Sequence, residues 1–327
     1  MGTDASARFV VTGRVPDSGL ELLRSAGTVE VADVEGALPR GELLRLVAGT
    51  DAVLTLLHDR VDDELLEAAG PGLRCVANVA VGYDNVDLEA AARRGVAVAN
   101  TPGVLDDATA DLTMALILAA ARRLGEAERL VRSGEPWAWG MGFMLGRDLR
   151  GKRLGIVGLG AIGRRVAERA RAFGMRIAYS GRHDADPAVV AQLEAKRLDL
   201  DELLASADVL SLHCPLSAET HHLIAAPQLA LMKPEAILVN AARGQVVDEA
   251  ALAEALREGR IAAAALDVYE HEPRVHPGLL GLENVTLIPH LGSATVETRR
   301  AMAELAARNA IAAVRGEPLP TPVALPD

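Results

Sequence analysis

A stretch near the middle of the chain has the pattern of a β-strand, a glycine turn and an amphipathic helix in direct succession. The apolar segment Lys152–Val157 runs into Gly158-Leu-Gly160-Ala-Ile-Gly163, and a helical pattern follows over residues 164–173. Gly158 permits a sharp turn, Gly160 lets the backbone approach a pyrophosphate, and Gly163 lets the helix pack closely on the strand. The phosphates would lie at the positive N-terminus of the helix. This spacing in this context predicts a dinucleotide-binding βαβ unit.

The rest of the chain predicts two α/β domains. A length of 327 residues, half of them apolar, is enough for two ordinary cores. Before a break at Asn100-Thr-Pro-Gly103, short β-rich runs alternate with helical patterns, as in a parallel sheet covered by helices. The β-rich runs of this first series are Arg8–Thr12, Val29–Val31, Ala52–Leu56, Cys75–Val79 and Val96–Ala99.

After a long apolar helix predicted over Ala108–Arg123, a second series of strands begins near Gly151. Its six candidate strands are Leu154–Gly158, Arg176–Ser180, Val209–Leu212, Ala236–Asn240, Ala263–Leu266 and Val285–Ile288. Six strands suit a full dinucleotide-binding domain, and the final helix, about Ala294–Val314, is expected to return to the first domain. We therefore expect two doubly wound parallel sheets: a Rossmann cofactor domain of residues 101–290, inserted in a flavodoxin-like substrate domain of residues 1–100 plus 291–327.

Composition narrows the class of partner. The net charge of −11 and the lack of a basic stripe argue against nucleic-acid binding, and no apolar run is long enough to span a membrane. No signal sequence is indicated, because the N-terminus has neither a basic region nor an apolar signal core. Two cysteines, Cys75 and Cys214, are too few for a disulfide framework. We expect a cytoplasmic protein whose partners are small molecules.

Three polar residues follow strands of the second series. Arg243, Glu272 and His290 come after the strands that end at Asn240, Leu266 and Ile288. Because open α/β sheets bind ligands at the carboxyl ends of their strands, these side chains are expected to converge. A cation, a proton donor and a carboxylate that tunes the donor are what the reduction of a carbonyl by a nicotinamide requires. No metal site is expected, because Pro273 would interrupt the helical turn that a zinc motif over residues 271–276 would need.

Several longer motifs extend this pattern. They are Val81-Gly-Tyr-Asp-Asn-Val-Asp87, Asn100–Asp111, Leu212-His-Cys-Pro-Leu216, Asn240-Ala-Ala-Arg-Gly244, Leu266-Asp-Val268 with Glu272-Pro273, and Pro289-His-Leu-Gly-Ser-Ala294. With these motifs and the glycine turn, the chain resembles the D-isomer-specific 2-hydroxyacid dehydrogenase family over essentially its full length. It is most similar to the glyoxylate and hydroxypyruvate reductase branch.

The resemblance implies roles for these residues. His290 would be the general acid, Glu272 would orient its imidazole and favour the protonated form, and Arg243 would bind the carboxylate and carbonyl oxygens of a small 2-oxo acid. The other substrate contacts would be the backbone amides of Val81 and Gly82 and the side chain of Leu57, although core packing explains the leucine equally well. The implied cofactor contacts are Thr109, Gly158, Gly160, Ala161, Ile162, Gly163, Ser180, Arg182, Cys214, Pro215, Thr220, Ala241, Arg243, Asp267, His290 and Gly292.

The end of the second strand of this domain bears on the choice of cofactor. NAD-preferring domains carry a carboxylate there for the ribose hydroxyls, whereas this strand ends in Ser180-Gly181-Arg182, and Asp184 comes too late in the loop. A hydroxyl followed by an arginine suits a 2′-phosphate. We therefore expect NADP to be preferred, with NAD possible.

Two further features concern assembly and departures from the family. Trp137, Trp139 and Phe143 concentrate scarce aromatic residues in one loop, which we interpret as the arm of a homodimer. Ala161 stands where many relatives have arginine, and Asp106 replaces a threonine common in the reductase branch. Alternative functions on the same scaffold are another D-2-hydroxyacid dehydrogenase, a phosphite dehydrogenase, or a nucleotide-sensing co-repressor that binds peptides.

Overall fold

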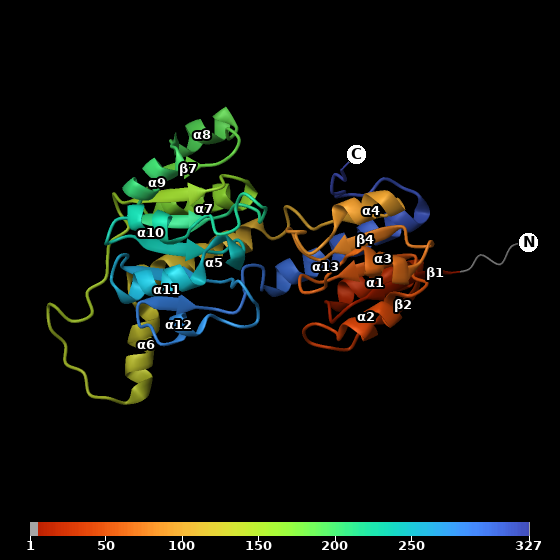
Figure 1. The fold of residues 1–327 in the computed structure, drawn as a ribbon, viewed down its shortest axis with the longest axis horizontal. Helices are drawn as coiled ribbons and strands as arrows, with labels where there is room; N and C mark the ends of the chain where they lie inside the picture. Colours follow the sequence, from red (N-terminus) through yellow and green to blue (C-terminus); the bar gives the residue numbers. More distant parts are fainter. Residues whose placement is uncertain (1–5, 327) are drawn as a thin grey trace, which may run out of the picture. The chain divides into compact units, whose positions relative to one another are not determined.

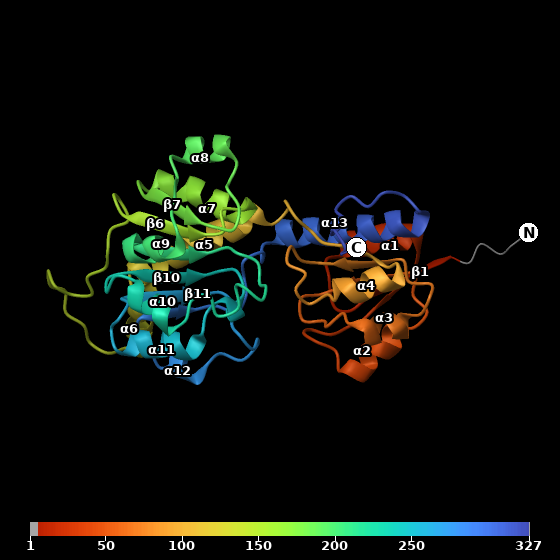
Figure 2. The same ribbon diagram turned by 45° about the horizontal axis from the view of Figure 1, so that its top comes forward.

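The computed structural model of the protein describes residues 6–326, so residues 1–5 and residue 327 of the predicted substrate domain lie outside it. Its contacts separate two compact units. Unit 1 contains the chain up to Leu105 and from Ser293 onward, and unit 2 contains Asp106–Gly292. The domain boundaries predicted from the sequence lie at 100/101 and 290/291. Figures 1 and 2 show the elements of each unit.

Unit 1 is a five-stranded parallel sheet with helices on both faces. Its strands are β1 (Ala7–Val11), β2 (Gly27–Val31), β3 (Ala52–Thr55), β4 (Cys75–Asn78) and β5 (Ala97–Ala99), in the order β2-β1-β3-β4-β5. Its helices are α1 (Asp17–Ala26), α2 (Arg40–Val47), α3 (Asp63–Ala69), α4 (Leu88–Arg94) and α13 (Val296–Arg315). This strand order is that of the flavodoxin-like fold, as predicted.

Helix α13 belongs to unit 1 because it packs on α1, β3 and β4. It begins two residues later than predicted, where Thr295 caps its N-terminus by accepting a hydrogen bond from the amide of Thr298. It ends at Arg315, and the next residue, Gly316, has a left-handed φ of 71°. The last segment of sequence therefore completes the domain that the first segment begins.

Unit 2 is a seven-stranded parallel sheet, one strand more than predicted. Its strands are β6 (Arg153–Val157), β7 (Arg176–Ser180), β8 (Lys196–Arg197), β9 (Val209–Leu212), β10 (Ile237–Asn240), β11 (Ala263–Leu266) and β12 (Val285–Leu287), in the order β12-β11-β10-β9-β6-β7-β8. The missed strand, β8, has only two exposed, basic residues, so it shows no hydrophobic period.

Helices cover both faces of this sheet. The helices of unit 2 are α5 (Asp106–Ala121), α6 (Leu124–Ser133), α7 (Ala161–Ala172), α8 (Pro187–Leu193), α9 (Leu200–Ser206), α10 (Ala226–Leu231), α11 (Glu249–Arg257) and α12 (Pro277–Leu280), with a 3-10 turn, η1, at Gly244–Val246. All of them except α6 lie against the body of the unit. Alternate strand residues face opposite sides: Ile156 and Val239 pack with α5 and α7, whereas Leu212 and Leu238 pack with α9, α10 and α11. Burial on both faces explains the nearly continuous apolar runs of these strands.

The predicted helix Ala108–Arg123 is wrong at both ends. Helix α5 starts at Asp106 and stops at Ala121. Arg123, with a left-handed φ of 55°, lies between α5 and α6 and separates the two helices. In Figure 1, α6 and the segment that follows it extend away from the sheet of unit 2. Within residues 6–326, no helix combines the length and the apolar composition that crossing a membrane requires.

Candidate active site

The predicted cofactor and catalytic residues of unit 2 lie along one edge of its sheet. Because all seven strands are parallel, their carboxyl ends share that edge. Following the strand order, the edge carries His290 after β12, Asp267 after β11, Arg243 after β10, Cys214 after β9, the glycine turn after β6, and Ser180 at the end of β7. Strand order reverses at β6 and β9, which is where open α/β sheets bind ligands.

The glycine turn is built as the spacing predicts. Gly158 has a φ of 93°, and a Cβ there would lie 2.8 Å from the backbone nitrogen of Cys214. At Gly163 a Cβ would overlap the carbonyl oxygen of Gly158. Gly160, the N-cap of α7, is exposed, and no neighbouring atom lies within 4 Å of its Cβ position. The turn thus leaves open backbone at a helix N-terminus, where a pyrophosphate can bind. Ala161 and Ile162 form the first turn of that helix.

The end of β7 presents cationic rather than anionic groups. The carbonyl of Ser180 accepts the amide of Gly158 at 2.9 Å, and Arg182 is exposed. Asp184 is ion-paired with Arg197 of β8, at 2.7 Å. Arg197 also donates to the carbonyl of Gly181 at 3.0 Å. One carboxylate oxygen of Asp184 is thus engaged by a guanidinium.

The segment after β9 lies next to the glycine turn. Cys214 is buried, and burial raises the pKa of its thiol to about 11, so it is a neutral neighbour of the glycine turn. The Thr220 hydroxyl donates to the carbonyl of Pro215 at 2.7 Å and accepts from the amide of Ser217 at 2.8 Å, which fixes the loop. His213 follows β9, as the sequence suggests, and burial lowers the pKa of its imidazole to about 4.

Arg243 is half-buried in a tight turn after β10, two residues beyond Ala241. The side chain of Asn240 holds this turn, since its amide nitrogen donates to the carbonyl of Arg243 at 2.8 Å and its oxygen accepts the amide of Ala242 at 3.1 Å. The next residue, Gly244, packs so closely on Tyr269 that a Cβ would overlap the tyrosine backbone. The turn that carries Arg243 is therefore packed against the segment that carries Glu272.

His290 and Glu272 are in direct contact. The imidazole Nδ1 lies 2.9 Å from Oε2 of Glu272, and the other carboxylate oxygen accepts the amide of Tyr269 at 3.1 Å. Burial by itself would raise the pKa of Glu272, but the hydrogen bond to His290 and its charge outweigh burial, so the pKa is lowered. An ionised carboxylate on Nδ1 fixes the ring and leaves Nε2 for a ligand.

Asp267 supports the backbone of His290. Its carboxylate is 1% exposed and accepts the amides of Leu291 at 2.5 Å and Gly292 at 2.8 Å, while its carbonyl accepts the amide of His290 at 2.7 Å. His290 is held at a φ of 53°, a left-handed conformation that is uncommon for residues other than glycine. Burial raises the pKa of Asp267, and the two amides partly offset this effect. Thr109 of α5 is buried beside Gly292.

The remaining predicted substrate residues lie in unit 1. Leu57 follows β3, and Val81 and Gly82 follow β4. Buried Asn78 donates to the carbonyl of Gly82 at 2.9 Å, and Asn100 donates to the carbonyl of Val81 at 2.8 Å. This loop therefore has a fixed backbone.

On the segment that carries Glu272, Oε2 of Glu270 lies 3.2 Å from Nε2 of His222. Sequence reasoning missed Asn240, Tyr269 and Asp267 as supports of the predicted catalytic residues. Asn240 is the last residue of β10, and Asp267 and Tyr269 follow within three residues of the end of β11; these positions were the available signal.

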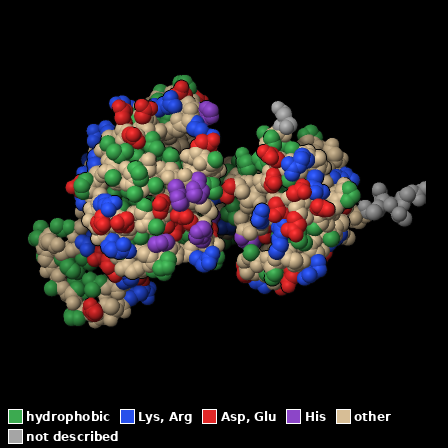
Figure 3. All heavy atoms as spheres, viewed as in Figure 1, with side chains coloured by type: hydrophobic (Ala, Val, Ile, Leu, Met, Phe, Trp, Pro, Cys, Tyr) green, Lys and Arg blue, Asp and Glu red, His purple; other side chains and the backbone are tan. Residues whose placement is uncertain are grey.

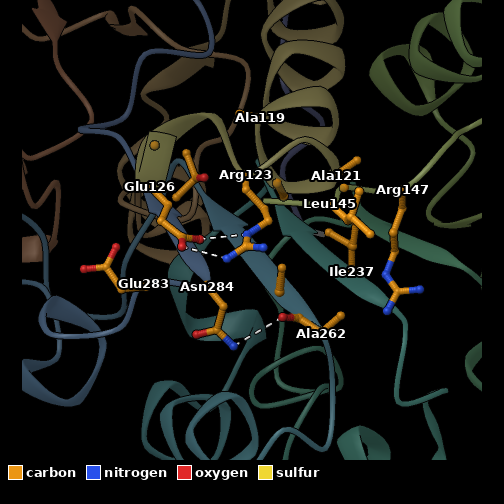
Figure 4. A pocket seen from close by; sticks show the side chains of 15 residues that line it. Ala119, Ala121, Arg123, Glu126, Leu145, Arg147, Ile237, Ala262, Glu283 and Asn284 are labelled. Atoms are coloured by element: carbon orange, nitrogen blue, oxygen red, sulfur yellow. Dashed lines mark hydrogen bonds and ion pairs between the residues drawn. The ribbon is translucent and has the colours of Figure 1, made fainter. Parts of the chain in front are cut away.

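A separate cavity of about 390 Å³ lies at the other edge of the sheet, beside the base of α6 (Figure 4). Its lining includes Arg123 and Glu126, which form an ion pair, and Asn284, which donates to the carbonyl of Ala262. None of the predicted catalytic or cofactor residues lines it. Among the described residues, no group of three or more histidine, cysteine or acidic side chains is arranged to hold a metal ion.

Comparison with known proteins gives the family. The family model described as "D-isomer specific 2-hydroxyacid dehydrogenase, NAD binding domain" matches residues 114–292. The chain belongs to this family. The dehydrogenase is 50% identical over 319 residues to the glyoxylate reductase of Thermococcus onnurineus, with 96% of this chain and 95% of the relative covered. As a member of the family it is an oxidoreductase that uses a nicotinamide cofactor.

Solved structures agree with this membership. The dehydrogenase superposes on a glyoxylate reductase from Paecilomyes thermophila with a TM-score of 0.87 and 37% identity, covering 97% of this chain and 98% of the other. It also superposes on an NADPH-dependent glyoxylate/hydroxypyruvate reductase from Sinorhizobium meliloti, solved with NADP and malonate, with a TM-score of 0.85 and 35% identity. There the coverage is 98% and 97%.

Proposed function

We propose that this dehydrogenase reduces a small 2-oxo acid, glyoxylate or hydroxypyruvate, to the D-2-hydroxy acid, with NADPH as its preferred reductant. The observation that carries the proposal is the 2.9 Å contact between His290 and Glu272, on the sheet edge that also bears Arg243 and the glycine turn. The relatives named glyoxylate reductase, about half identical over nearly the whole chain, support the choice of substrate.

The residues at the edge have complementary tasks. The nicotinamide, when bound, supplies the hydride. His290 donates the proton of Nε2 to the carbonyl oxygen, because Nδ1 is engaged by Glu272. Arg243 binds the substrate carboxylate and polarises the carbonyl through its planar donors. Leu57 and the amides of Val81 and Gly82 remain proposed substrate contacts.

The glycine turn fits the cofactor that this chemistry needs. Open backbone at Gly160 and the N-terminus of α7 would hold the pyrophosphate, with Ala161, Ile162 and Gly163 in the same turn. Cys214, Pro215 and Thr220 would border the adenosine, and Thr109, Ala241, Asp267 and Gly292 the nicotinamide half.

The preference for NADPH rests on the end of β7. Ser180 and exposed Arg182 would bind the 2′-phosphate, and Asp184, the nearest carboxylate in that loop, is held by Arg197. We expect Arg182→Ala to reduce the ratio of kcat/KM for NADPH to that for NADH by about tenfold or more, as loss of a charge-assisted contact does. Arg176→Ala, at the opposite end of the same strand, is the matched control. A wild-type enzyme that prefers NADH contradicts this part of the proposal.

The reaction is tested by following NADPH absorbance with a panel of small 2-oxo acids. His290→Ala should lower turnover by about 10²- to 10⁴-fold, the usual contribution of a general acid, and leave NADPH affinity nearly intact. Arg243→Ala should raise KM and lower kcat together. If no 2-oxo acid is reduced by the wild-type protein, or if neither variant slows turnover, the assignment is wrong and a ligand-sensing role becomes the better explanation.

We further propose that the enzyme is a homodimer joined through an arm formed by α6 and residues 134–146. The arm exposes large apolar side chains, and none of the residues of α6 is buried. These side chains are Leu124, Val131, Trp137, Trp139, Met141, Phe143 and Leu145, and Figure 3 shows hydrophobic atoms gathered there. A patch of this kind marks an interaction surface. Trp139→Ala should shift the sedimentation coefficient toward a monomer, whereas Phe173→Ala, an exposed aromatic on the main body of unit 2, should not.

The cytoplasm is the proposed compartment. Cys75 and Cys214 are unpaired, buried thiols, a state that a reducing compartment maintains. Fractionation of source cells, with the activity followed in each fraction, tests this assignment.

A further inference from the structure

A buried carboxylate outside the proposed chemistry holds the segment that carries Glu272. Glu249 is the first residue of α11 and is 5% exposed. Its Oε1 accepts the amide of Glu270 at 2.8 Å, and its Oε2 accepts the amide of His276 at 3.1 Å. These two amides lie on either side of Glu272 in the sequence. Glu249 therefore closes the segment of residues 270–276 into a loop whose two ends meet one carboxylate.

The contact is reciprocal. The backbone amide of Glu249 donates to Oε1 of Glu270 at 2.8 Å, which satisfies one of the free donors at the start of α11. Asp248 caps the same helix by accepting the amide of Ala251 at 2.9 Å. The loop with Glu272 is thus fixed to a regular element through both main-chain and side-chain groups.

The same support reaches the turn that carries Arg243. The side-chain amide of Gln245 donates to the carbonyl of Glu270 at 2.9 Å, and Gly244 leaves no room for a side chain against Tyr269. Tyr269 in turn donates its amide to Glu272. The structure therefore connects Glu249 to Glu272 by a short path of hydrogen bonds and backbone.

The chemistry of Glu249 suits this task. Burying a carboxylate is costly unless hydrogen bonds compensate it, and here two backbone amides do so. An apolar side chain would fill the space but leave both amides unpaired. The titratable side chains around it are Glu270, His222, which lies 3.2 Å from Glu270, and the Tyr269 hydroxyl, whose pKa is raised first by burial and then by nearby carboxylates, Glu249 among them.

We propose that Glu249 is a positioning residue for the reaction: by holding the amides of Glu270 and His276, it keeps Glu272 in hydrogen-bond contact with His290. The inference rests on the proposed function, because it takes the Glu272–His290 pair as the catalytic one. Glu249 itself acts only through the segment of residues 270–276 and is not assigned a contact with substrate or cofactor.

The test is Glu249→Gln in the full-length enzyme. A carboxamide has one accepting oxygen, so one of the two backbone amides loses its partner. We expect kcat with NADPH and glyoxylate to fall on the order of tenfold or more, as small misplacements of catalytic groups do. NADPH affinity should be unchanged, and the alkaline limb of the kcat profile should move to lower pH, as in Glu272→Gln. Glu254→Gln, an exposed glutamate on the same helix, is the matched control.

A double-mutant cycle separates positioning from general stability. If Glu249 acts through Glu272, then Glu249→Gln should have little further effect on kcat or on the pH profile when Glu272 is already glutamine. Independent, multiplying losses in the two variants would overturn the inference, as would a normal pH profile in Glu249→Gln. Should that variant fold poorly in urea titrations, Glu249→Asp, which keeps the charge with a shorter reach, gives the same comparison. If instead Glu272→Gln alone leaves turnover and its pH dependence unchanged, the proposed function fails rather than the role of Glu249.

Discussion

Replacing Glu272 by glutamine isolates the charge of the proposed catalytic pair, Glu272 and His290. Glutamine has nearly the same shape and keeps an oxygen that can accept from Nδ1 of His290, now 2.9 Å from the carboxylate. What disappears is the negative charge, which in the wild-type enzyme persists at neutral pH because the pKa of Glu272 is lowered. The substitution therefore leaves the position of the ring largely intact and removes the electrostatic support of its protonated form.

The size of the effect follows from the geometry. A hydrogen bond between charged partners contributes about 1.5–3 kcal/mol. Because the Glu272 side chain is 36% exposed and that of His290 is 28% exposed, solvent weakens their interaction, and we take the lower part of that range. About 1.5–2 kcal/mol corresponds to a loss in kcat of roughly 10- to 30-fold.

The assay is steady-state reduction of glyoxylate by NADPH from about pH 5 to about pH 9, the range in which a histidine acid titrates. The alkaline limb of the kcat profile should move to lower pH in Glu272→Gln, because the carboxylate no longer favours the imidazolium that donates the proton. Glu235→Gln, an exposed glutamate of the same unit, should match the wild type. A Glu272→Gln enzyme with unchanged kcat and an unchanged alkaline limb would refute the catalytic pairing.

Two further predictions concern the glycine turn and the stability of unit 2. Gly163→Ala should lower NADPH affinity and also lower the free energy of unfolding by about 1–3 kcal/mol, because the new methyl group overlaps the carbonyl of Gly158. Gly160→Ala should weaken NADPH binding without a loss of stability, because its Cβ position is open. Equal losses of stability in the two variants, measured in urea, would contradict this. Asp208→Asn should destabilise the protein by about 1–2 kcal/mol at pH 7, since the carboxylate accepts an amide of β6 and a lysine ammonium. Burial raises the pKa of Asp208 but these partners lower it overall, so its contribution is present above the unfolded pKa of about 4 and is lost as pH falls further. The free energies of unfolding of the wild type and of Asp208→Asn, measured in urea, should therefore differ at neutral pH and converge at low pH. A difference that stays constant with pH would argue against this role of the Asp208 carboxylate.

Most of the fold could be predicted from the sequence because strands, helices and the glycine turn each leave a pattern within a short stretch of residues. The glycine turn that begins at Gly158 needs only six residues, and each longer strand contains an apolar run that is visible in the sequence. These patterns were enough to predict the α/β class, and the longer motifs gave the family resemblance. Where a strand has two residues, as in β8, no period exists to detect, and the sheet gained a strand that the sequence did not indicate. Both ends of α5 and the start of α13 lie two residues from their predicted places. Thr295 caps the start of α13, and the left-handed Arg123 follows the end of α5.

Local pattern is enough to predict the side chains of the proposed site. Arg243, Glu272 and His290 each follow a strand, and the carboxyl ends of the strands in a parallel sheet share one edge. How these side chains are held depends on the fold of the whole chain. The amides that Asp267 and Glu249 accept come from residues 21 to 27 positions away, and the partner of His222 is 48 positions away. Buried polar groups must find partners wherever the folded chain places them, and that placement depends on the path of the whole backbone.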